Sequence, residues 1–413
     1  MQQKYKIDHR EVEKGDIFVA IKGQKVDGHD FVKKIAPVAS LAIVQKKLPD
    51  CLIPQLVVKD PILHLQKLAK EKLEEKKPLV CAITGAFGKT SAKDLLFSLV
   101  SPFISCARSL KSHNTKISLP LTILNELQNQ ELLILEKSMT HKGDLERLVD
   151  IAPAHFVLTT AMPKYLHHYS HAKNFATLEG MIQAKQEIFA SKNLSFAITQ
   201  DDDFKAISPR HSYSVWDKQA EFFAKLEDGL EVYHHKKCVL KAQLDFPKHH
   251  LPNLLGSIAM AFYLGLSFEQ IKGQLEVLSL PSMRFEQMEK KGHVFINDAY
   301  NASPYTFAKA FENLPKAKRK FAILGHMPEL GKETKRGHHE VLEKAKEHFD
   351  YVFCIGSNWD REKIKTLGFY HFLDQNECIE CILNEIQQED LLFFKGARSL
   401  YLEDMLQAIK QKI

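Results

Sequence analysis

The chain has 413 residues, of which 45% are hydrophobic and 26% are charged, and its formal net charge is +6. This length exceeds one ordinary hydrophobic core, so we expect two to four domains, and the composition excludes wholesale disorder. The positive charge is modest and its lysines are scattered. It therefore gives no reason to expect a nucleic-acid partner, and anionic phosphorylated ligands fit it equally well.

The first domain is predicted over residues 1–76 as a small α/β unit. Strands are expected at DIFVAIKG (16–23), SLAIVQ (40–45) and QLVVKD (55–60). Asp60 then caps a helix that has Pro61 at its first position.

The second domain, predicted over residues 77–279, opens with the apolar strand LVCAI (79–83), a glycine-bearing turn and the helical KTSAKDLLFSLV (89–100). Further buried strands are expected at ELLILE (131–136) and HFVLTT (155–160). Continuous apolar runs separated by helices indicate a parallel sheet that is covered on both faces.

The third domain, predicted over residues 280–413, repeats this pattern, with strands expected at HVFIND, KFAILG, DYVFCIG and DLLFFKG. The predicted fold class is therefore α/β with three domains. These are a small N-terminal domain, a central doubly wound domain with a phosphate loop, and a Rossmann-like C-terminal domain.

The segment between the first central strand and its helix has the composition of a phosphate loop. It runs Thr84-Gly85-Ala86-Phe87-Gly88-Lys89-Thr90, which matches the variant TGxxGKT. Glycines allow backbone N–H groups to surround phosphate oxygens at a positive helix N-terminus. Lys89 is placed to neutralise the β- and γ-phosphates, and the hydroxyl of Thr90 to bind Mg²⁺. An ordinary glycine turn is the alternative, but strand, loop and helix are all in place.

Two charged residues stand at unusual positions. Lys185 falls in the middle of the apolar stripe of the helix ATLEGMIQAKQEIFA (176–190), where it must either snorkel to solvent or lose its charge. A neutral amine at this position could react with CO₂ to form a carbamate, which would bind a metal ion as a carboxylate does. Glu136 ends an apolar strand at the edge where doubly wound sheets bind ligands, although such a glutamate is often only solvated.

Other features predict little chemistry. No apolar run is long enough to cross a bilayer, and the N-terminus lacks the apolar core of a signal peptide, so we expect a cytoplasmic protein that is not embedded in a membrane. The lone CxxC of Cys378 and Cys381 predicts reduced thiols. Adjacent histidines such as His167-His168 and His234-His235 predict solvent-exposed or singly used side chains, because neighbouring residues on regular structure point in different directions.

Taken together, the motifs resemble the Mur ligase family over residues 8–404. The matching segments are Asp8-His9-Arg10, VEKGDIFVAIKGQKVDGHDF, ITGAFGKTSAK, NTKISLPLTIL, LEKSMTHKGDL, AKQEIF, KHHLPNLLGSIAMA, Arg284, DAYNASP, LGHMPELG and KGAR. The YNASP run and the LGxMxELG segment resemble the branch of the family that adds D-alanyl-D-alanine.

The resemblance implies an ATP-dependent amide ligase that adds D-alanyl-D-alanine to UDP-N-acetylmuramoyl-tripeptide through an acyl phosphate, as a monomer. It implies that Lys185 is carbamylated and that Lys89, Lys185 and Glu136 are catalytic. Two Mg²⁺ ions would be held by Thr90, Glu136 and carbamylated Lys185. Asn253, Arg284 and Asp298 would join the phosphate loop in binding ATP, and the UDP-sugar peptide would be bound through Asp8, Arg10, Asp27, Gly28 and His29.

The sequence departs from the family pattern at several positions. Tyr165 stands where a metal-side histidine is usual, and His167 or His168 could serve instead. Thr159 and Thr160 replace asparagines, His326 replaces an aspartate and His9 a serine, and Ser118 and Met283 each replace a glycine. The third residue of the tripeptide is not marked by any motif.

Three alternatives to this activity remain. The first is a related Mur-type or folylpolyglutamate-type ligase with another amine acceptor. The second is a weakly active homologue that serves as a binding module, which Tyr165 would favour. The third is an unrelated P-loop kinase or transport ATPase, against which Lys185 and the UDP-domain motifs argue.

Overall fold

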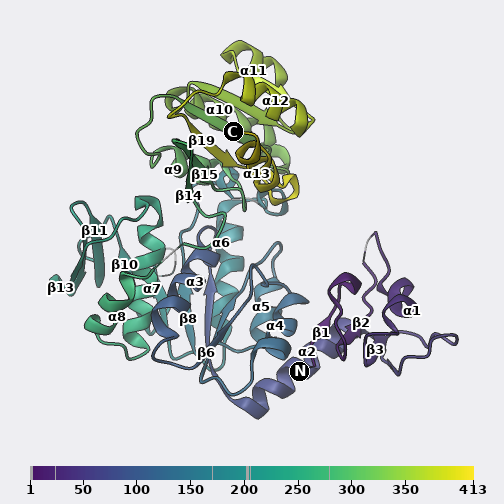
Figure 1. The fold of residues 1–413 in the computed structure, drawn as a ribbon. Coiled ribbons are helices and arrows are strands. Elements are labelled where there is room, and N and C mark those ends of the chain that lie inside the picture. Colours follow the sequence, from purple (N-terminus) through teal and green to yellow (C-terminus); the bar gives the residue numbers. More distant parts are fainter. Residues whose placement is uncertain (1–2, 24, 170, 201–203, 205, 279) are drawn as a thin grey trace.

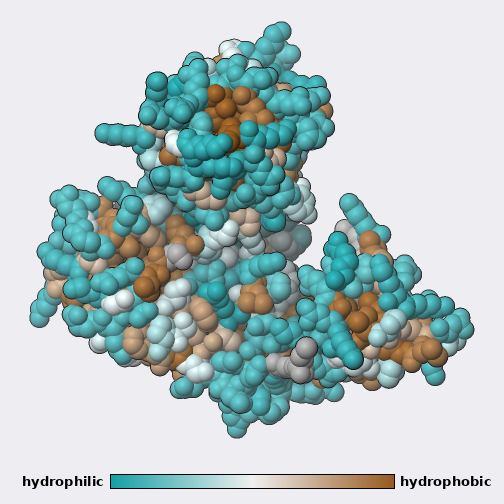
Figure 2. Space-filling view, in the orientation of Figure 1, coloured by the Kyte–Doolittle hydropathy of each residue, from teal (hydrophilic) through white to brown (hydrophobic). Residues whose placement is uncertain are grey.

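The computed structural model describes residues 3–413 except 24, 170, 201–203, 205 and 279. It contains three sheets, each with its own helices, as the sequence predicts (Figure 1). The N-terminal sheet lies beside the central one, and the C-terminal sheet lies above it in the view of Figure 1. Figure 2 shows the same arrangement as lobes, with open space between the N-terminal and C-terminal lobes on this face.

The N-terminal sheet has four parallel strands in the order β1-β2-β3-β4. Its elements are β1 (Tyr5–Lys6), η1 (His9–Glu11), β2 (Ile17–Val19), η2 (Gly28–Phe31), α1 (Val32–Ile35), β3 (Leu41–Val44), β4 (Gln55–Val57) and α2 (Pro61–Lys76). Asp60 caps α2 by accepting from the N–H groups of Ile62 and Leu63, as expected.

Two attachments join this small unit to the central domain. Leu65 and Ala69 of α2 are buried in a core that one face of the N-terminal sheet shares with the central domain. The side chain of Asn125 also holds both backbone groups of Tyr5, accepting from its N–H at 2.8 Å and donating to its carbonyl at 2.9 Å. The N-terminal sheet is therefore fixed to the central domain at two places.

The central sheet has nine strands in the order β13-β12-β11-β10-β9-β8-β5-β7-β6. The elements that surround the site are β5 (Leu79–Thr84), α3 (Lys89–Val100), β6 (Cys106–Arg108), α4 (Ser118–Glu126), β7 (Leu132–Glu136), α5 (Asp144–Ile151), β8 (Phe156–Thr159), η3 (Leu166–His168), η4 (Ala172–Asn174), α6 (Leu178–Gln186) and η5 (Glu187–Ala190). They are followed by β9 (Phe196–Thr199), β10 (Arg210–Ser214), β11 (Phe222–Leu226), β12 (Leu230–His234), β13 (Lys237–Ala242), η7 (Lys248–His250), α7 (Leu251–Tyr263) and α8 (Phe268–Leu275).

Strand β5 shows why this sheet is doubly wound. Val80 and Ala82 face one hydrophobic core with α4 and α5, whereas Cys81 and Ile83 face a second core with α3, α7 and α8. Because successive side chains of a strand point to opposite faces, a strand that is covered by helices on both sides must be apolar throughout. The predicted parallel sheet is confirmed, but the antiparallel extension formed by β11, β12 and β13 was not predicted.

The C-terminal sheet has the strand order β14-β15-β19-β16-β17-β18, in which only β14 is antiparallel to its neighbour. Its elements are β14 (Glu286–Lys290), β15 (His293–Asn297), α9 (Pro304–Phe311), β16 (Lys320–Gly325), η8 (Gly331–Glu333), α10 (Thr334–His348), β17 (Tyr351–Ile355), α11 (Arg361–Leu367), β18 (Tyr370–Phe372), α12 (Gln375–Glu385), β19 (Leu391–Lys395), η9 (Arg398–Leu400) and α13 (Leu402–Lys412). Two cores, one on each face, confirm the predicted doubly wound fold.

No helix among the described residues is both long and apolar enough to span a membrane. Cys378 and Cys381 lie one turn apart on α12, the first buried and the second half-buried.

Candidate active site

A cavity of about 230 Å³ lies where the central and C-terminal domains meet. The central domain lines it with the phosphate loop, the segment that follows β6, the end of β7 and the start of α7. The C-terminal domain lines it with the segments that follow α8 and β15, with α9 and with the last residue of β19. The lining residues include Ala86, Phe87, Gly88, Lys89, Thr90, Ser112, Asn114, Glu136, His171, Asn253, Arg284, Asp298, Tyr300, Tyr305 and Lys395.

The phosphate loop is shaped by two glycines that no other residue could replace without strain. Gly85 has φ +146° and Gly88 has φ +80°, both in the left-handed region. A Cβ at Gly85 would lie 2.1 Å from Thr160 Oγ1, and one at Gly88 would lie 2.1 Å from Asn253 Oδ1. The loop is thus pressed against β8 on one side and α7 on the other, and it opens onto the N-terminus of α3.

Lys89 folds back over this loop. Its Nζ donates to the carbonyls of Gly85 at 3.1 Å and Ala86 at 3.3 Å. Burial lowers the pKa of this ammonium, Glu136 opposes that effect, and Arg284 adds to it. A cation held over carbonyls at a helix N-terminus is placed to bind a phosphate group.

A cluster of oxygen ligands surrounds Glu136 at the carboxyl end of β7. Thr90 Oγ1 donates to Glu136 Oε2 at 2.9 Å and lies 3.2 Å from Ser112 Oγ. Asn114 Nδ2 donates to Glu136 Oε1 at 2.7 Å. Glu136 is only 1% exposed. Hydroxyl and carboxylate oxygens are the ligands that Mg²⁺ prefers, and 2.9 Å is close to the spacing of adjacent oxygens around such an ion.

Lys185 lies beneath the same loop and is fully buried, so it does not snorkel. Its Nζ donates to the Gly85 carbonyl at 2.8 Å and lies 5.3 Å from the centre of the Tyr169 ring. Burial, together with the nearby positive charge of Lys89, holds the pKa of this amine well below its usual value. The structure thus brings Lys89 and Lys185 to one carbonyl oxygen.

The C-terminal domain brings aromatic and charged groups against the loop. The ring of Tyr305 stacks on that of Phe87, with centroids 4.5 Å apart, and Tyr300 donates from its hydroxyl to Ser112 Oγ at 2.5 Å. Arg284 lies over the Tyr300 ring at 4.1 Å, and its buried Nε has no hydrogen-bond partner among the described residues. A guanidinium with a free buried donor at this position is suited to an anionic ligand.

Asp298 and Lys395 form a buried ion pair in the same wall. Lys395 Nζ donates to Asp298 Oδ2 at 2.6 Å and to the Asn301 carbonyl at 3.1 Å, while Asp298 Oδ1 accepts from the N–H of Phe285 at 3.2 Å. Lys395 was not among the predicted site residues, although, like Glu136, it ends an apolar strand. Its place at the end of a buried strand was the signal by which the sequence could have identified it.

The start of α7 closes the other end of the cavity. Asn253 is 7% exposed, and its side chain lies beside Gly88 and 3.4 Å from His250 Nδ1. Burial lowers the pKa of His249 to about 4 and holds that of His250 well below its usual value, so both rings are neutral at pH 7. Neutral rings and an amide can contact a purine base without adding charge.

The predicted UDP-site residues lie in the N-terminal domain, and the lining of this cavity includes none of them. Asp8 caps η1 and forms an ion pair with Arg10 at 2.5 Å, which lowers the pKa of Asp8 to about 2. Asp27 caps η2 and lies 2.6 Å from His29 Nδ1, and a Cβ at Gly28 would lie 2.7 Å from the Ile21 nitrogen. These side chains shape two adjacent turns.

The segment around Tyr165 differs from the predicted alternatives. Tyr165 is 58% exposed, and His167 and His168 face Glu340 of the C-terminal domain instead of the cavity. Among the described residues of this segment, His171 lines the cavity. The prediction that adjacent histidines are exposed or used singly is wrong for His167 and His168, because the 3₁₀ turn η3 lets both rings approach one carboxylate.

Met283 and His326, at positions where the resemblance predicts glycine and aspartate, are accommodated differently. Met283 has φ +58°, the backbone conformation that a glycine would adopt without strain. His326 packs against Gly356, where a Cβ would lie 2.1 Å from its Nδ1.

A phosphate loop at the end of a parallel sheet, covered by a second doubly wound domain that contributes charged groups, defines a P-loop nucleotide-binding enzyme whose site lies between two domains. Comparisons with known proteins identify the kind. Family models match along nearly the whole chain: the Mur ligase family catalytic domain at residues 4–71, the Mur ligase middle domain at 83–261, and the Mur ligase glutamate ligase domain at 283–398.

Relatives and solved structures agree with these models. UDP-N-acetylmuramoyl-tripeptide–D-alanyl-D-alanine ligases from Bacillus subtilis and Borreliella burgdorferi are each 26% identical over 97% of this chain and over 91% and 93% of their own lengths. The crystal structure of the MurF ligase of Thermotoga maritima in complex with ADP has a TM-score of 0.82 at 27% identity and covers 99% of this chain and 97% of its own. A MurF structure from Acinetobacter baumannii has a TM-score of 0.83 at 26% identity, covering 99% and 93%. The chain belongs to the Mur ligase family.

Proposed function

We propose that this protein is the ATP-dependent ligase that joins D-alanyl-D-alanine to UDP-N-acetylmuramoyl-tripeptide in peptidoglycan precursor synthesis. The observation that carries the proposal is the similarity to ligases of this name over 97% of the chain, together with a cavity that unites the phosphate loop with charged groups of the C-terminal domain. We also propose that it acts in the cytoplasm as a monomer, with domains at 1–76, 77–279 and 280–413.

ATP would lie with its phosphates over the loop. Lys89 would leave the Gly85 and Ala86 carbonyls to contact the β- and γ-phosphates, and the unpaired Nε of Arg284 would meet the phosphates from the opposite wall. Asn253 would contact the adenine base beside the neutral rings of His249 and His250. In this arrangement the γ-phosphate lies next to the oxygen cluster of Thr90 and Glu136.

The donor sets of the site fit the cofactors that the family implies. Thr90 and Glu136 would hold one Mg²⁺, since both offer oxygen atoms at a suitable separation. The low pKa of Lys185 would allow CO₂ to add to its neutral amine, and the remaining N–H of the carbamate could still donate to the Gly85 carbonyl. The carbamate of Lys185 would then help to hold a second Mg²⁺. Bound Mg²⁺ would offset negative charge on the transferred phosphoryl group.

A carboxylate must be activated before it can form an amide, because oxide is too poor a leaving group. An oxygen of the tripeptide carboxylate would attack the γ-phosphorus, the bond to the bridging oxygen of ADP would break, and an acyl phosphate would form. The amine of D-alanyl-D-alanine would then attack the carbonyl carbon and expel phosphate. Lys89 and Arg284 would stabilise the phosphoryl charge in the first step.

Closure of the C-terminal domain would protect the acyl phosphate from water. The stack of Tyr305 on Phe87 and the hydrogen bond from Tyr300 to Ser112 are the contacts that cover the loop. The UDP moiety would bind at the two turns that contain Asp8, Arg10, Asp27, Gly28 and His29. The N-terminal domain would therefore hold the substrate by its UDP end, far from the peptide carboxylate that reacts.

The test supplies ATP, Mg²⁺, UDP-N-acetylmuramoyl-tripeptide and D-alanyl-D-alanine and measures phosphate release and product mass. We expect the UDP-pentapeptide and one phosphate per product. Each substrate is omitted in turn, and D-alanyl-D-alanine is replaced by single amino acids, glutamate among them. Equal product with another amine would assign a different acceptor, and tight UDP-substrate binding without any product would leave only a binding role. A Lys89→Ala variant should lose turnover, whereas a matched Lys316→Ala variant outside the cavity should not.

A further inference from the structure

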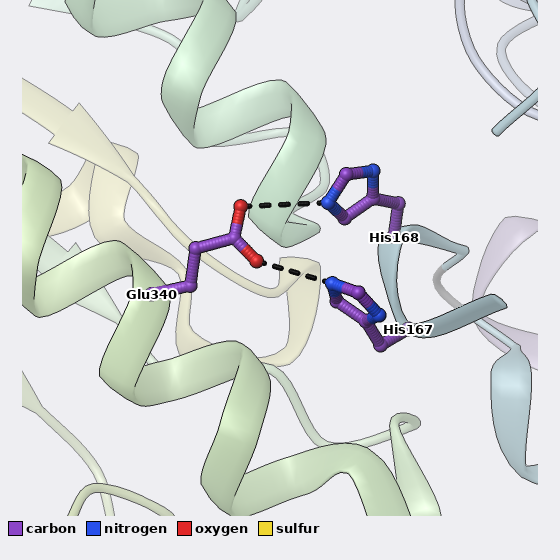
Figure 3. A group of neighbouring side chains, drawn as sticks. All are labelled: His167, His168 and Glu340. Atoms are coloured by element: carbon purple, nitrogen blue, oxygen red, sulfur yellow. Dashed lines mark hydrogen bonds and ion pairs between the residues drawn. The ribbon is translucent and has the colours of Figure 1, made fainter. Parts of the chain in front are cut away.

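The segment between β8 and α6 meets the C-terminal domain at a cluster that the proposed reaction does not use. His167 and His168, at the end of η3, face Glu340 on α10 (Figure 3). Each carboxylate oxygen of Glu340 points toward one ring. The distance is 3.2 Å from His167 Nε2 to Oε2 and 3.4 Å from His168 Nε2 to Oε1.

The three side chains of this cluster are largely buried. The side chains of His167, His168 and Glu340 are 6%, 14% and 28% exposed. The ring of Tyr165 packs against both imidazoles, stacked on His167 with centroids 5.5 Å apart and edge-on to His168 at 5.3 Å. The more exposed carboxylate leaves one side of the cluster open to solvent.

Both imidazoles direct the same ring nitrogen, Nε2, toward the carboxylate of Glu340. A neutral imidazole has one free lone pair, and both Nε2 atoms here face the carboxylate. Two imidazoles and one carboxylate are a ligand set that suits Zn²⁺, whereas Mg²⁺ prefers oxygen ligands alone.

We propose that His167, His168 and Glu340 form a binding site for a divalent transition-metal ion of the zinc class, which ties the central domain to the C-terminal domain. Ligands at 2.0–2.1 Å around a tetrahedral ion are separated by about 3.3–3.4 Å, close to the two N···O distances observed. All three donor atoms lie within 4.8 Å of one another, so a single ion can gather them as its ligands. A water molecule takes the fourth position on the open side.

This ion would act on the covering of the phosphate loop. His168 lies 6.0 Å from the ring of Tyr305, which in turn stacks on Phe87 of the loop. Ligands from both domains can meet only when the domains are closed, so the ion binds the closed arrangement preferentially and stabilises it. It is separate from the Mg²⁺ cluster, since Thr90 and Glu136 take no part.

A second group of similar composition does not carry the same inference. Glu221, His234 and His235 also gather their ligand atoms, but Glu221 already accepts from Tyr263 and contacts His211 at 3.0 Å. That carboxylate is satisfied within its own domain, and His235 is 70% exposed. His235 therefore offers a matched control position.

The experiment titrates chelator-treated full-length protein with Co²⁺ by visible absorption and with Zn²⁺ by calorimetry, without ATP or Mg²⁺. Wild type should bind one ion with the weak absorption bands of nitrogen and oxygen ligands and without sulfur-to-cobalt absorption. His168→Gln and Glu340→Gln should each weaken this binding at least about 100-fold, because each removes a direct ligand. His235→Gln should leave it unchanged.

Small-angle scattering supplies the second readout. Zn²⁺ should reduce the radius of gyration of wild type and of His235→Gln, but not that of Glu340→Gln. The proposal is overturned if wild type binds no ion, if its cobalt spectrum shows thiolate ligands, or if both ligand variants bind as wild type does. Because the wild-type spectrum alone can refute the site, the test does not depend on the variants folding.

Discussion

Separating Asp298 from Lys395 should destabilise the C-terminal domain more than almost any surface change. Both side chains are buried, with Lys395 3% exposed and Asp298 7% exposed, and their charged atoms are 2.6 Å apart. At an effective dielectric constant of about 20, their attraction is about 6 kcal/mol, and most of it offsets the desolvation of the two charges. Asp298→Asn leaves a buried ammonium without its partner, so we expect a loss of about 3–5 kcal/mol.

The double variant separates this penalty from the net value of the pair. Lys395→Met alone leaves Asp298 unpaired and should also cost about 3–5 kcal/mol. Asp298→Asn combined with Lys395→Met removes both charges and should cost only about 1–2 kcal/mol, mainly for the lost bond from Lys395 to the Asn301 carbonyl, because the amide oxygen of asparagine can still accept from the Phe285 N–H. The coupling energy should therefore be several kcal/mol.

The assay can follow the C-terminal domain by itself. The chain has two tryptophans. Trp359 is buried in this domain at 4% exposure, whereas Trp216 is 65% exposed in the central domain. In a Trp216→Phe background, urea unfolding monitored by fluorescence reports on the C-terminal core. If the free energy of unfolding of the double variant falls by the sum of the two single decreases, the two charges are not coupled and the reasoning is wrong.

Three further outcomes are expected. Lys185→Ala should nearly abolish ligase turnover, and acetate or another short carboxylate should partly restore it; full activity without an additive would refute the carbamate role. Met283→Gly should raise the free energy of unfolding by about 0.5–1 kcal/mol, because it relieves the strain of a positive φ at some cost in chain entropy. Phe285 also has a positive φ, but Phe285→Gly should lower the free energy of unfolding because it removes a buried ring. His155 has a pKa below its usual value through burial and accepts from the Val80 N–H at 3.0 Å. The unfolded chain therefore binds the proton first, stability should fall as pH drops below about 6.5, and His155→Gln should weaken that dependence in urea melts at pH 7 and 5.

The buried strands of both large domains could be predicted because each is apolar without interruption. The antiparallel extension was missed because β11 and β12 alternate buried and half-buried side chains, a weaker pattern. One signal was available, since Asp228-Gly229 stands between these two strands as a hairpin turn does. The next turn has His235 and Lys236 at positive φ, which the sequence gives no reason to expect.

The candidate site was marked in the sequence by a motif at Lys89, by a strand end at Glu136 and by helical periodicity at Lys185. Of the groups that the C-terminal domain contributes, Arg284 and Asp298 were expected only through the family resemblance, and Tyr305 was not predicted. Tyr305 contacts Phe87 across a domain boundary, and Glu340 approaches His167 from α10, so local periodicity holds no trace of either contact. Such contacts depend on how whole domains dock, which a single sequence does not specify by pattern.

The double attachment of the N-terminal sheet fixes the distance between the N-terminal domain and the phosphate loop. Because α2 packs into the core shared with the central domain and Asn125 bonds both backbone groups of Tyr5, the turns that contain Asp8 and Asp27 are held at a constant distance from the phosphate loop. If the UDP moiety binds at these turns, as proposed above, only a peptide of matching length can place its carboxylate at the phosphate loop. A peptide one residue too short would not reach the loop, so selection for length would need no contact with the side chain of the third residue.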